Sequence, residues 1–143
     1  MADQVYFEDV RVGDEIPPLH KNCSTRQLVM WAGAASDFYA LHYDEAFARS
    51  TGLDGIIVHG ALKSAFLGQL LHDWIAPGGF LRQFGCQYRG MDYPNQDIRC
   101  RGIVTKKYEA GGEGVIELDI WTENPGGQRT TPGTATLVLP HRG

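Results

Sequence analysis

The chain has 143 residues, of which 43% are hydrophobic, and this is enough for one domain with a single core. Its formal net charge of −4 argues against a nucleic acid or an anionic membrane as a partner. We find no basic and apolar leader at the N-terminus, and no apolar run of the roughly 18 residues that cross a bilayer. The three cysteines are widely spaced, as is typical of reduced thiols. We therefore expect one domain, residues 1–143, soluble and cytoplasmic.

The first half of the chain shows mainly helical signals. A short strand over residues 10–16 is expected to complete a sheet. Ser24 can then begin a helix, because its side chain can accept a hydrogen bond from the amide of Gln27 in a capping box. Asp44 can cap a short helix, which Gly52 can end in a left-handed conformation.

The longest predicted helix covers residues 61–75 and is apolar on nearly all sides. Its polar residues, Lys63 among them, scatter around the helix instead of gathering on one side. A helix of this kind belongs in the interior of a protein. The residues that follow, APGG at 76–79, end it.

Alternation of apolar and polar residues with a period of two replaces the helical pattern after residue 80. The predicted strands are 80–89, 97–108, 115–121 and 134–140. The glycine-rich segments EAGGEG and NPGGQ look like hairpin connections between them. The predicted fold class is α+β, with one long central helix wrapped by an antiparallel β-sheet.

The stretch AASDFYALHYDEAF, residues 34–47, carries an acid and a base among aromatic rings. Asp37 and His42 are five residues apart, a spacing that does not share a helix face, so they converge only if the chain leaves the helix at Asp37. Together they suit general acid–base catalysis. The alternative for each alone is structural: a loop carboxylate that binds backbone amides, and a partly buried histidine.

Three further groups near this stretch are candidates for a site. The amide of Gly60 lies at a helix N-terminus, where free N–H groups can stabilise a negative charge; alternatively, Gly60 only allows a tight turn. Tyr39 and Tyr43 suit either packing or the lining of a substrate pocket. His59 could contact substrate, although orienting the turn before Gly60 is the interpretation that its position favours.

The segment SDFYALHYDEAFARSTGLDGIIVHGALKSAF, residues 36–66, resembles the MaoC-like, or type 2 (R-specific) enoyl-CoA hydratase, family of hot-dog proteins. That family has roughly Asp-x-Asn-Pro-aliphatic-His, then an acid, a short helix, and a His-Gly pair that opens the central helix. Residues 6–16 also look like its first strand, and residues 88–104 look like its later hairpin. The chain departs from the pattern at Tyr39, where the family often has Asn, and at Ala40, where it often has Pro. The matching residues are Asp37, Leu41, His42, Asp44, His59 and Gly60.

The resemblance implies a hydratase or dehydratase that interconverts a trans-2-enoyl and a 3-hydroxyacyl thioester of coenzyme A. It supports Asp37 and His42 as the catalytic pair. Gly60 joins them as the expected oxyanion donor, and Tyr39, Tyr43 and His59 are the candidate substrate-binding residues beside this motif. Coenzyme A would enter only as part of the substrate, with no other cofactor. No metal is expected, and the remaining histidines show no ligand spacing.

Other activities and assemblies stay open at this stage. A 3-hydroxyacyl-ACP dehydratase is close, and a hot-dog thioesterase is a weaker alternative. A non-catalytic hot-dog subunit that binds thioesters within a heteromer is a third. Family members pair their sheets edge to edge, so a homodimer or higher oligomer is expected, or a heteromer with another hot-dog subunit. Basic residues on the later strands could meet the phosphates of coenzyme A, although a solvated strand face is favoured. They are Arg99, Arg101, Lys106 and Lys107.

Overall fold

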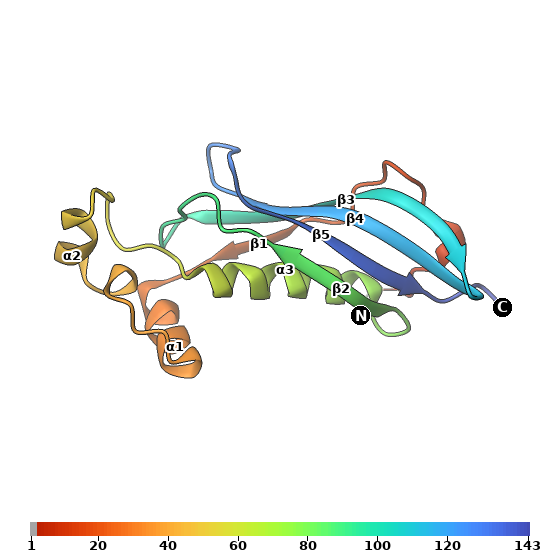
Figure 1. The fold of residues 1–143 in the computed structure, drawn as a ribbon, viewed down its shortest axis with the longest axis horizontal. Helices are drawn as coiled ribbons and strands as arrows, with labels where there is room; N and C mark the ends of the chain where they lie inside the picture. Colours follow the sequence, from red (N-terminus) through yellow and green to blue (C-terminus); the bar gives the residue numbers. More distant parts are fainter. Residues whose placement is uncertain (1–2) are drawn as a thin grey trace.

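The computed structural model describes residues 3–143 as one curled antiparallel sheet with a long helix against it (Figure 1). The strands lie in the order β1-β3-β4-β5-β2, and every neighbouring pair is antiparallel. The two edges of the sheet are therefore β1 and β2. The strands are β1 (Leu19–Asn22), β2 (Phe80–Cys86), β3 (Asp97–Ala110), β4 (Glu113–Glu123) and β5 (Arg129–Leu139).

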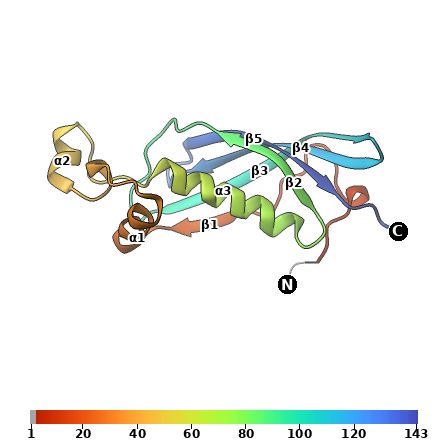
Figure 2. The same cartoon turned by 60° about the horizontal axis from the view of Figure 1, so that its bottom comes forward.

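The long helix α3 (Gly60–Ile75) packs along one face of the sheet (Figure 2). Leu67 and Leu71 of the helix and Ile116 and Leu137 of the strands are almost completely buried in the shared core. Each such side chain contributes about 1.5–3 kcal/mol through removal from water. The predicted α+β architecture, a central helix wrapped by an antiparallel sheet, is confirmed.

Two shorter helices, α1 (Thr25–Ala35) and α2 (Glu45–Ser50), lie together at the end of the molecule where α3 begins (Figure 1). Their predicted caps are confirmed, because Ser24 Oγ accepts from the amide of Gln27 at 3.1 Å and Asp44 Oδ1 accepts from the amide of Phe47 at 3.0 Å. Gly52 has the expected left-handed backbone. Among the described residues, none of the helices combines the length and apolarity that a membrane crossing requires.

The strand predicted over residues 10–16 is wrong. Residues Phe7–Asp9 form a 3₁₀ turn, and Asp14 closes a further turn by accepting from the amide of Arg11 at 2.8 Å. Gly13 has φ +95°, which does not fit a strand. Residues 13–16 bind β3 through a single bridge, between Glu15 and Ile103, and the backbone hydrogen bonds around it, and the first strand begins later, at Leu19.

The hairpin suggested for residues 88–104 is also wrong. β2 pairs with β5, and residues 87–96 form an irregular connection that carries the chain from β2 to β3. The two glycine-rich turns are as predicted: they join β3 to β4 and β4 to β5, with left-handed backbone at Gly111, Gly112 and Gly127. The irregular connection matters for the site, because it passes beside the start of α3.

Candidate active site

The end of α1 brings Asp37 and His42 to one place. Ser36 adopts the left-handed conformation, with φ 53°, and the amide of Asp37 donates to the carbonyl of Ala32 at 3.0 Å. The chain then leaves the helical direction. A 3₁₀ turn, η2 (Ala40–His42), follows and places His42 beside Asp37. The predicted departure from the helix at Asp37 is therefore what allows a five-residue spacing to close.

Asp37, His42 and His59 form a compact cluster. One side-chain oxygen or nitrogen from each residue lies within 4.8 Å of the other two. His59 is fully buried, His42 is 8% exposed and Asp37 is half-buried, so the cluster is open to solvent mainly on the side of the carboxylate. The structure thus brings together the acid and base predicted from sequence and adds a second imidazole to them.

The hydrogen bond of His42 to the backbone fixes which nitrogen can act as a base. Its Nδ1 lies 2.8 Å from the carbonyl oxygen of Ile57. A carbonyl oxygen only accepts hydrogen bonds, so Nδ1 carries the proton and donates it. In the neutral ring Nε2 then has a lone pair, and His42 can take a proton there.

His59 is held neutral beside His42. The two rings stack with centroids 3.8 Å apart and an angle of 21° between their planes. Burial, and then the proximity of His42, lower the pKa of His59 below its ordinary value. Its Nε2 donates to the carbonyl oxygen of Asp37 at 3.3 Å, and its buried Nδ1 has no partner among the described residues. Burial therefore disfavours a positive charge on His59.

The carboxylate of Asp37 retains most of its capacity to accept hydrogen bonds. Its one bond within the described chain is a long one, 3.4 Å from the amide of Tyr39 to Oδ1. The ring of Tyr39 lies edge-on to His42, with centroids 6.3 Å apart, and is 55% exposed. Tyr39 therefore borders the cluster. Tyr43 is 52% exposed and has no aromatic contact with either histidine in the described structure.

Gly60 is the first residue of α3, whose N-terminus has no side-chain cap. The first bond that closes the helix runs from the amide of Lys63 to the carbonyl of His59, at 3.2 Å, so the amide of Gly60 is not used within the helix. Because His59 directly precedes Gly60, this amide lies next to the Asp37–His42–His59 cluster.

The structure gives a different reason for glycine at position 60 than a tight turn. Gly60 is not among the glycines with positive φ, so its backbone does not require glycine. A Cβ atom at this position would lie 2.6 Å from Cδ2 of Tyr88, far inside van der Waals contact. Glycine is therefore needed because the ring of Tyr88 packs directly against it. Sequence reasoning missed Tyr88, which lies 28 residues further along the chain in a segment predicted as strand.

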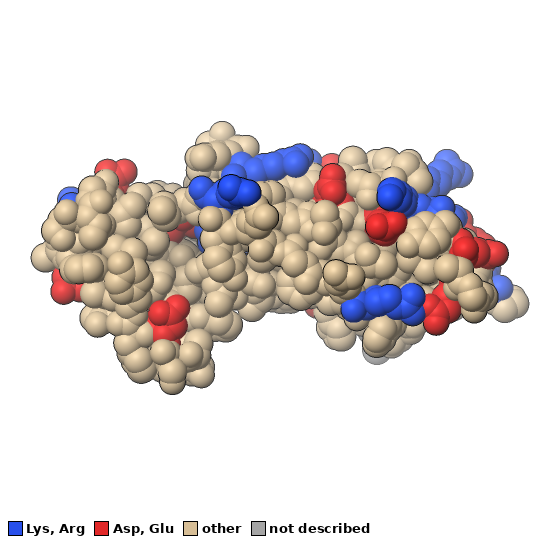
Figure 3. Space-filling view, in the orientation of Figure 1, with Lys and Arg blue, Asp and Glu red and all other residues tan. Residues whose placement is uncertain are grey.

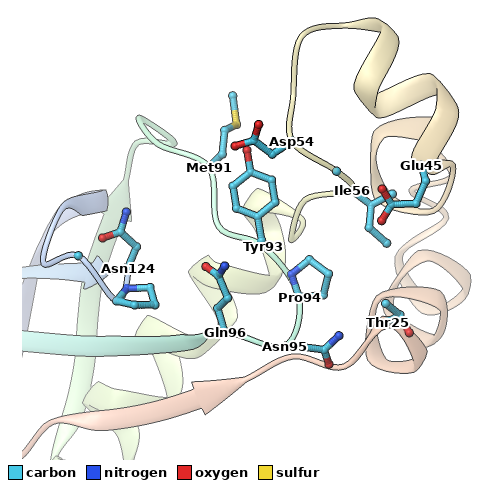
Figure 4. A pocket seen from close by; sticks show the side chains of 13 residues that line it. Thr25, Glu45, Asp54, Ile56, Met91, Tyr93, Pro94, Asn95, Gln96 and Asn124 are labelled. Atoms are coloured by element: carbon cyan, nitrogen blue, oxygen red, sulfur yellow. The ribbon is translucent and has the colours of Figure 1, made fainter.

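A cavity of about 560 Å³ opens nearby, between α2, the connection from β2 to β3, and the turn after β4 (Figure 4). Segment 55–58 separates it from the cluster: Ile57 binds His42 on one side, while the amide of Val58 donates to the carbonyl of Asp92 on the other. The lining includes the carboxylates of Glu45 and Asp54 and contains neither Lys nor Arg. Such a lining does not suit the phosphates of a nucleotide.

The basic residues proposed for phosphate contacts are mostly engaged elsewhere. Arg101 pairs with Glu15 and Glu123, Lys106 lies 4.0 Å from Glu117, and Lys107 donates to the carbonyl of Val10. Most Lys and Arg side chains on the face in Figure 3 lie over the sheet, with few over α1 and α2. This agrees with a solvated strand face.

Known proteins are similar to this chain in sequence and in fold. The MaoC like domain matches residues 9–120. The chain is 26% identical over 143 residues to the (R)-specific enoyl-CoA hydratase of Rhodospirillum rubrum, covering 96% of this chain and 94% of that one. It is 32% identical over 100 residues to the fatty acid synthase beta subunit TOXC of Cochliobolus carbonum, covering 68% of this chain but 5% of that protein. The solved R-hydratase PhaJ1 from Pseudomonas aeruginosa superposes with a TM-score of 0.85 at 18% identity, covering 97% of this chain and 88% of that one.

The curled sheet around one helix, shared with this R-hydratase, is a hot-dog fold. The family match covers well over half of the sequence. The chain therefore belongs to the MaoC-like dehydratase domain family.

Proposed function

We propose that this protein is a hydratase or dehydratase that interconverts a trans-2-enoyl thioester and a 3-hydroxyacyl thioester of coenzyme A. The observation that carries the proposal is the convergence of Asp37 with a His42 whose Nδ1 is committed to the carbonyl of Ile57. The ring thereby presents a basic Nε2 beside a carboxylate with unused acceptor capacity, a pair that can bind and polarise one water molecule.

The proposed reaction proceeds as an addition of water in balanced steps. The water oxygen bonds to C3 of the enoyl group as Asp37 and His42 take one of its protons. The electron pair of the C2–C3 double bond moves onto the thioester as an enolate, and C2 then receives a proton from the same pair. The sum is one water added, and dehydration is the reverse. The thioester itself acidifies C2, so no metal is required.

The developing negative charge on the thioester oxygen needs a hydrogen-bond donor. The amide of Gly60 is available for this, because the N-terminus of α3 has no side-chain cap. The macrodipole of the 16-residue helix adds a partial positive charge at the same end. Gly60 is therefore the proposed oxyanion donor, while Tyr39 and His59 are proposed to shape the site around the substrate.

The named relatives support the choice of substrate. The Rhodospirillum rubrum relative is an (R)-specific enoyl-CoA hydratase, and the chain spans 94% of it. By extension we propose the (R)-3-hydroxyacyl product here. An acyl-carrier-protein dehydratase is the nearest alternative, since coenzyme A and acyl carrier protein present the same pantetheine arm. The match to a section of a fatty acid synthase subunit is a second reason for this alternative.

A panel of enoyl thioesters tests the proposal. Purified protein, in the presence of EDTA, is incubated with enoyl-CoA esters of increasing chain length while the enoyl absorbance and the free thiol are both followed. Hydration removes the absorbance without releasing thiol, whereas a thioesterase releases thiol. A change in neither signal would contradict an enzymatic role on CoA esters. The same acyl groups on acyl carrier protein then decide between the two carriers by kcat/KM.

A further inference from the structure

Lys63 and Asp92 form an ion pair that is almost completely removed from solvent. Each side chain is 2% exposed, and Nζ of Lys63 lies 2.9 Å from Oδ2 of Asp92. The same Nζ donates to the carbonyl of Gly90 at 2.9 Å. The pair joins the first turn of α3 to the connection between β2 and β3, two segments 29 residues apart in sequence.

Stability alone does not explain this pair. Removing two charges from water costs about as much as their attraction returns, and well-packed apolar residues often replace such pairs without loss of stability. Oδ1 of Asp92 has no hydrogen-bond partner in residues 3–143, so the carboxylate depends on Lys63 for its neutralisation. The pair therefore contributes mainly through the positions that its directional hydrogen bonds impose on the neighbouring segments.

The pair encloses the turn that leads into the candidate active site. The carbonyl of Asp92 accepts from the amide of Val58 at 2.8 Å, and the amide of Lys63 donates to the carbonyl of His59 at 3.2 Å. The backbone of Asp92 thus binds Val58, and the backbone of Lys63 binds His59. The ion pair between the two side chains completes a closed ring of contacts around the turn 58–60. Gly60 lies within this ring of contacts.

The same pair also sets the position of Tyr88. The carbonyl of Gly90 is bound by Lys63, and the amide of Gly90 donates to the carbonyl of Thr130 at 2.9 Å. Residue 90 is therefore held from the helix and from β5 at once, two residues away from Tyr88. With the connection fixed there, the ring of Tyr88 packs against Gly60 although it is 57% exposed.

We propose that Lys63 and Asp92 are positioning residues for the reaction: their ion pair holds the amide of Gly60 and the ring of Tyr88 in register with the Asp37–His42 pair. The inference rests on the proposed hydratase function. An apolar contact in the same place would fill the volume but would let the connection slide along the helix. A misplacement of about 1 Å in such a site can cost about 10²-fold in rate.

The test replaces the pair by apolar residues of similar volume, Lys63→Met with Asp92→Leu, since removal of Lys63 alone would leave a buried carboxylate unpaired. We expect the double variant to fold with a melting temperature close to that of the wild type. We also expect its kcat for hydration of the best enoyl-CoA ester to fall about 10- to 100-fold, with KM changed less than about threefold. Lys63→Gln with Asp92→Asn, which keeps a hydrogen bond between the two side chains and buries no unpaired charge, should retain more turnover than the apolar double variant. A folded double variant with full turnover would overturn the inference.

Tyr88→Ala provides a test that does not depend on folding of an altered core, because this side chain is largely exposed. If the pair acts partly through Tyr88, removal of the ring should lower kcat. The triple variant that combines Tyr88→Ala with Lys63→Met and Asp92→Leu should then lose less turnover than the product of the losses in Tyr88→Ala and in the apolar double variant. Tyr88→Ala with unchanged kcat and unchanged chain-length preference would count against the inference. An inactive wild type would instead count against the proposed function, so the two failures are distinguishable.

Discussion

His59 shows how burial and a neighbouring ring together affect the charge of one residue. Its ring is stacked on His42, and two adjacent imidazoles cannot both become cationic without strong repulsion. Burial, and then the proximity of His42, lower the pKa of His59, so the neutral form of His59 is favoured in the cluster. The sequence favours His59 as a residue that orients the turn before Gly60, and its bond to the carbonyl of Asp37 is of that kind. Its stacking on His42 could not be predicted from sequence, since it depends on how the loop folds.

The lowered pKa of His59 makes a prediction about stability and pH. Below an ordinary pKa near 6.5, the unfolded chain binds a proton at His59 that the folded protein does not. Stability is therefore complete above this pH and falls as the pH decreases toward the folded pKa, by at most about 1.4 kcal/mol per pH unit. His59→Phe keeps a flat ring and should flatten this dependence, as measured by urea unfolding while the pH is lowered from above 6.5 to below it.

The matched control for this experiment is His72→Phe, because His72 is exposed on α3. This variant shows how much of any change in slope comes simply from replacing a histidine of the helix by phenylalanine. Equal slopes for the wild type and His59→Phe would show that His59 is protonated alike in the folded and unfolded states, and this would contradict a neutral His59 beside His42.

At the scale of elements, the sequence predicts features that depend on a few neighbouring residues. It does not predict features that depend on contacts between distant segments. The caps at Ser24 and Asp44 and the positive-φ glycines follow from local chemistry. The irregular connection between β2 and β3 does not, because it is held by bonds to distant partners, such as that of Gly90 to Thr130.

Lys63 explains why the polar residues of α3 look scattered in the sequence although the helix has one exposed side. The exposed residues Ala61, Ala65, Gln69 and His72 follow one another at helical spacing, so the helix has one exposed side. Lys63 lies on the buried side, paired with Asp92, and its charge made the polar residues seem scattered. A lysine in an otherwise apolar helix signals a buried partner, but the sequence does not show which of the acids it is.

The contact between Gly60 and Tyr88 leads to a prediction for the start of α3. Gly60→Ala should clash with the ring of Tyr88 and, if the amide of Gly60 stabilises the enolate, should lower the single-turnover rate by about 10²–10³-fold. The double variant Gly60→Ala with Tyr88→Ala separates two causes. If the added methyl crowds the thioester itself, the rate stays low relative to Tyr88→Ala alone.

Recovery of the single-turnover rate in that double variant, to the level of Tyr88→Ala, would mean that the methyl acts only by displacing the ring. Gly60 would then be removed from the catalytic residues. Melting temperatures measured on the same preparations show whether any loss of rate reflects loss of folded protein.

At the scale of the whole molecule, exposed aromatic residues gather at one end of the chain. Phe38, Tyr39, Tyr43 and Tyr88 are each more than half exposed, and all lie near the end of the molecule that carries the Asp37–His42–His59 cluster. Large apolar side chains gathered around one site are typical of an interface or a ligand-binding surface. In addition, β2 is a sheet edge of seven residues with no second neighbour in the described chain.

We therefore predict that the protein forms at least a dimer at micromolar concentration, with the candidate active site close to the interface. Sedimentation velocity, with activity measured on the same fractions, checks this. A stable monomer that retains full activity would contradict it. If the protein alone is inactive, co-purification from its native source tests for a second hot-dog subunit.

Asp37 and His42 are proposed to carry out the addition of water together, and the proposed function depends on this pair above all. The pair is tested most directly by turnover of the best enoyl-CoA ester by Asp37→Asn, His42→Ala and the double variant. Exposed residues of α3 supply the matched controls, Asp73→Asn and His72→Ala. We expect each single variant to lose about 10²–10⁴-fold in kcat while remaining folded by circular dichroism. The double variant should lose far less than the product of the two, because the residues act as one unit. Near-full turnover in either folded single variant would contradict the assignment.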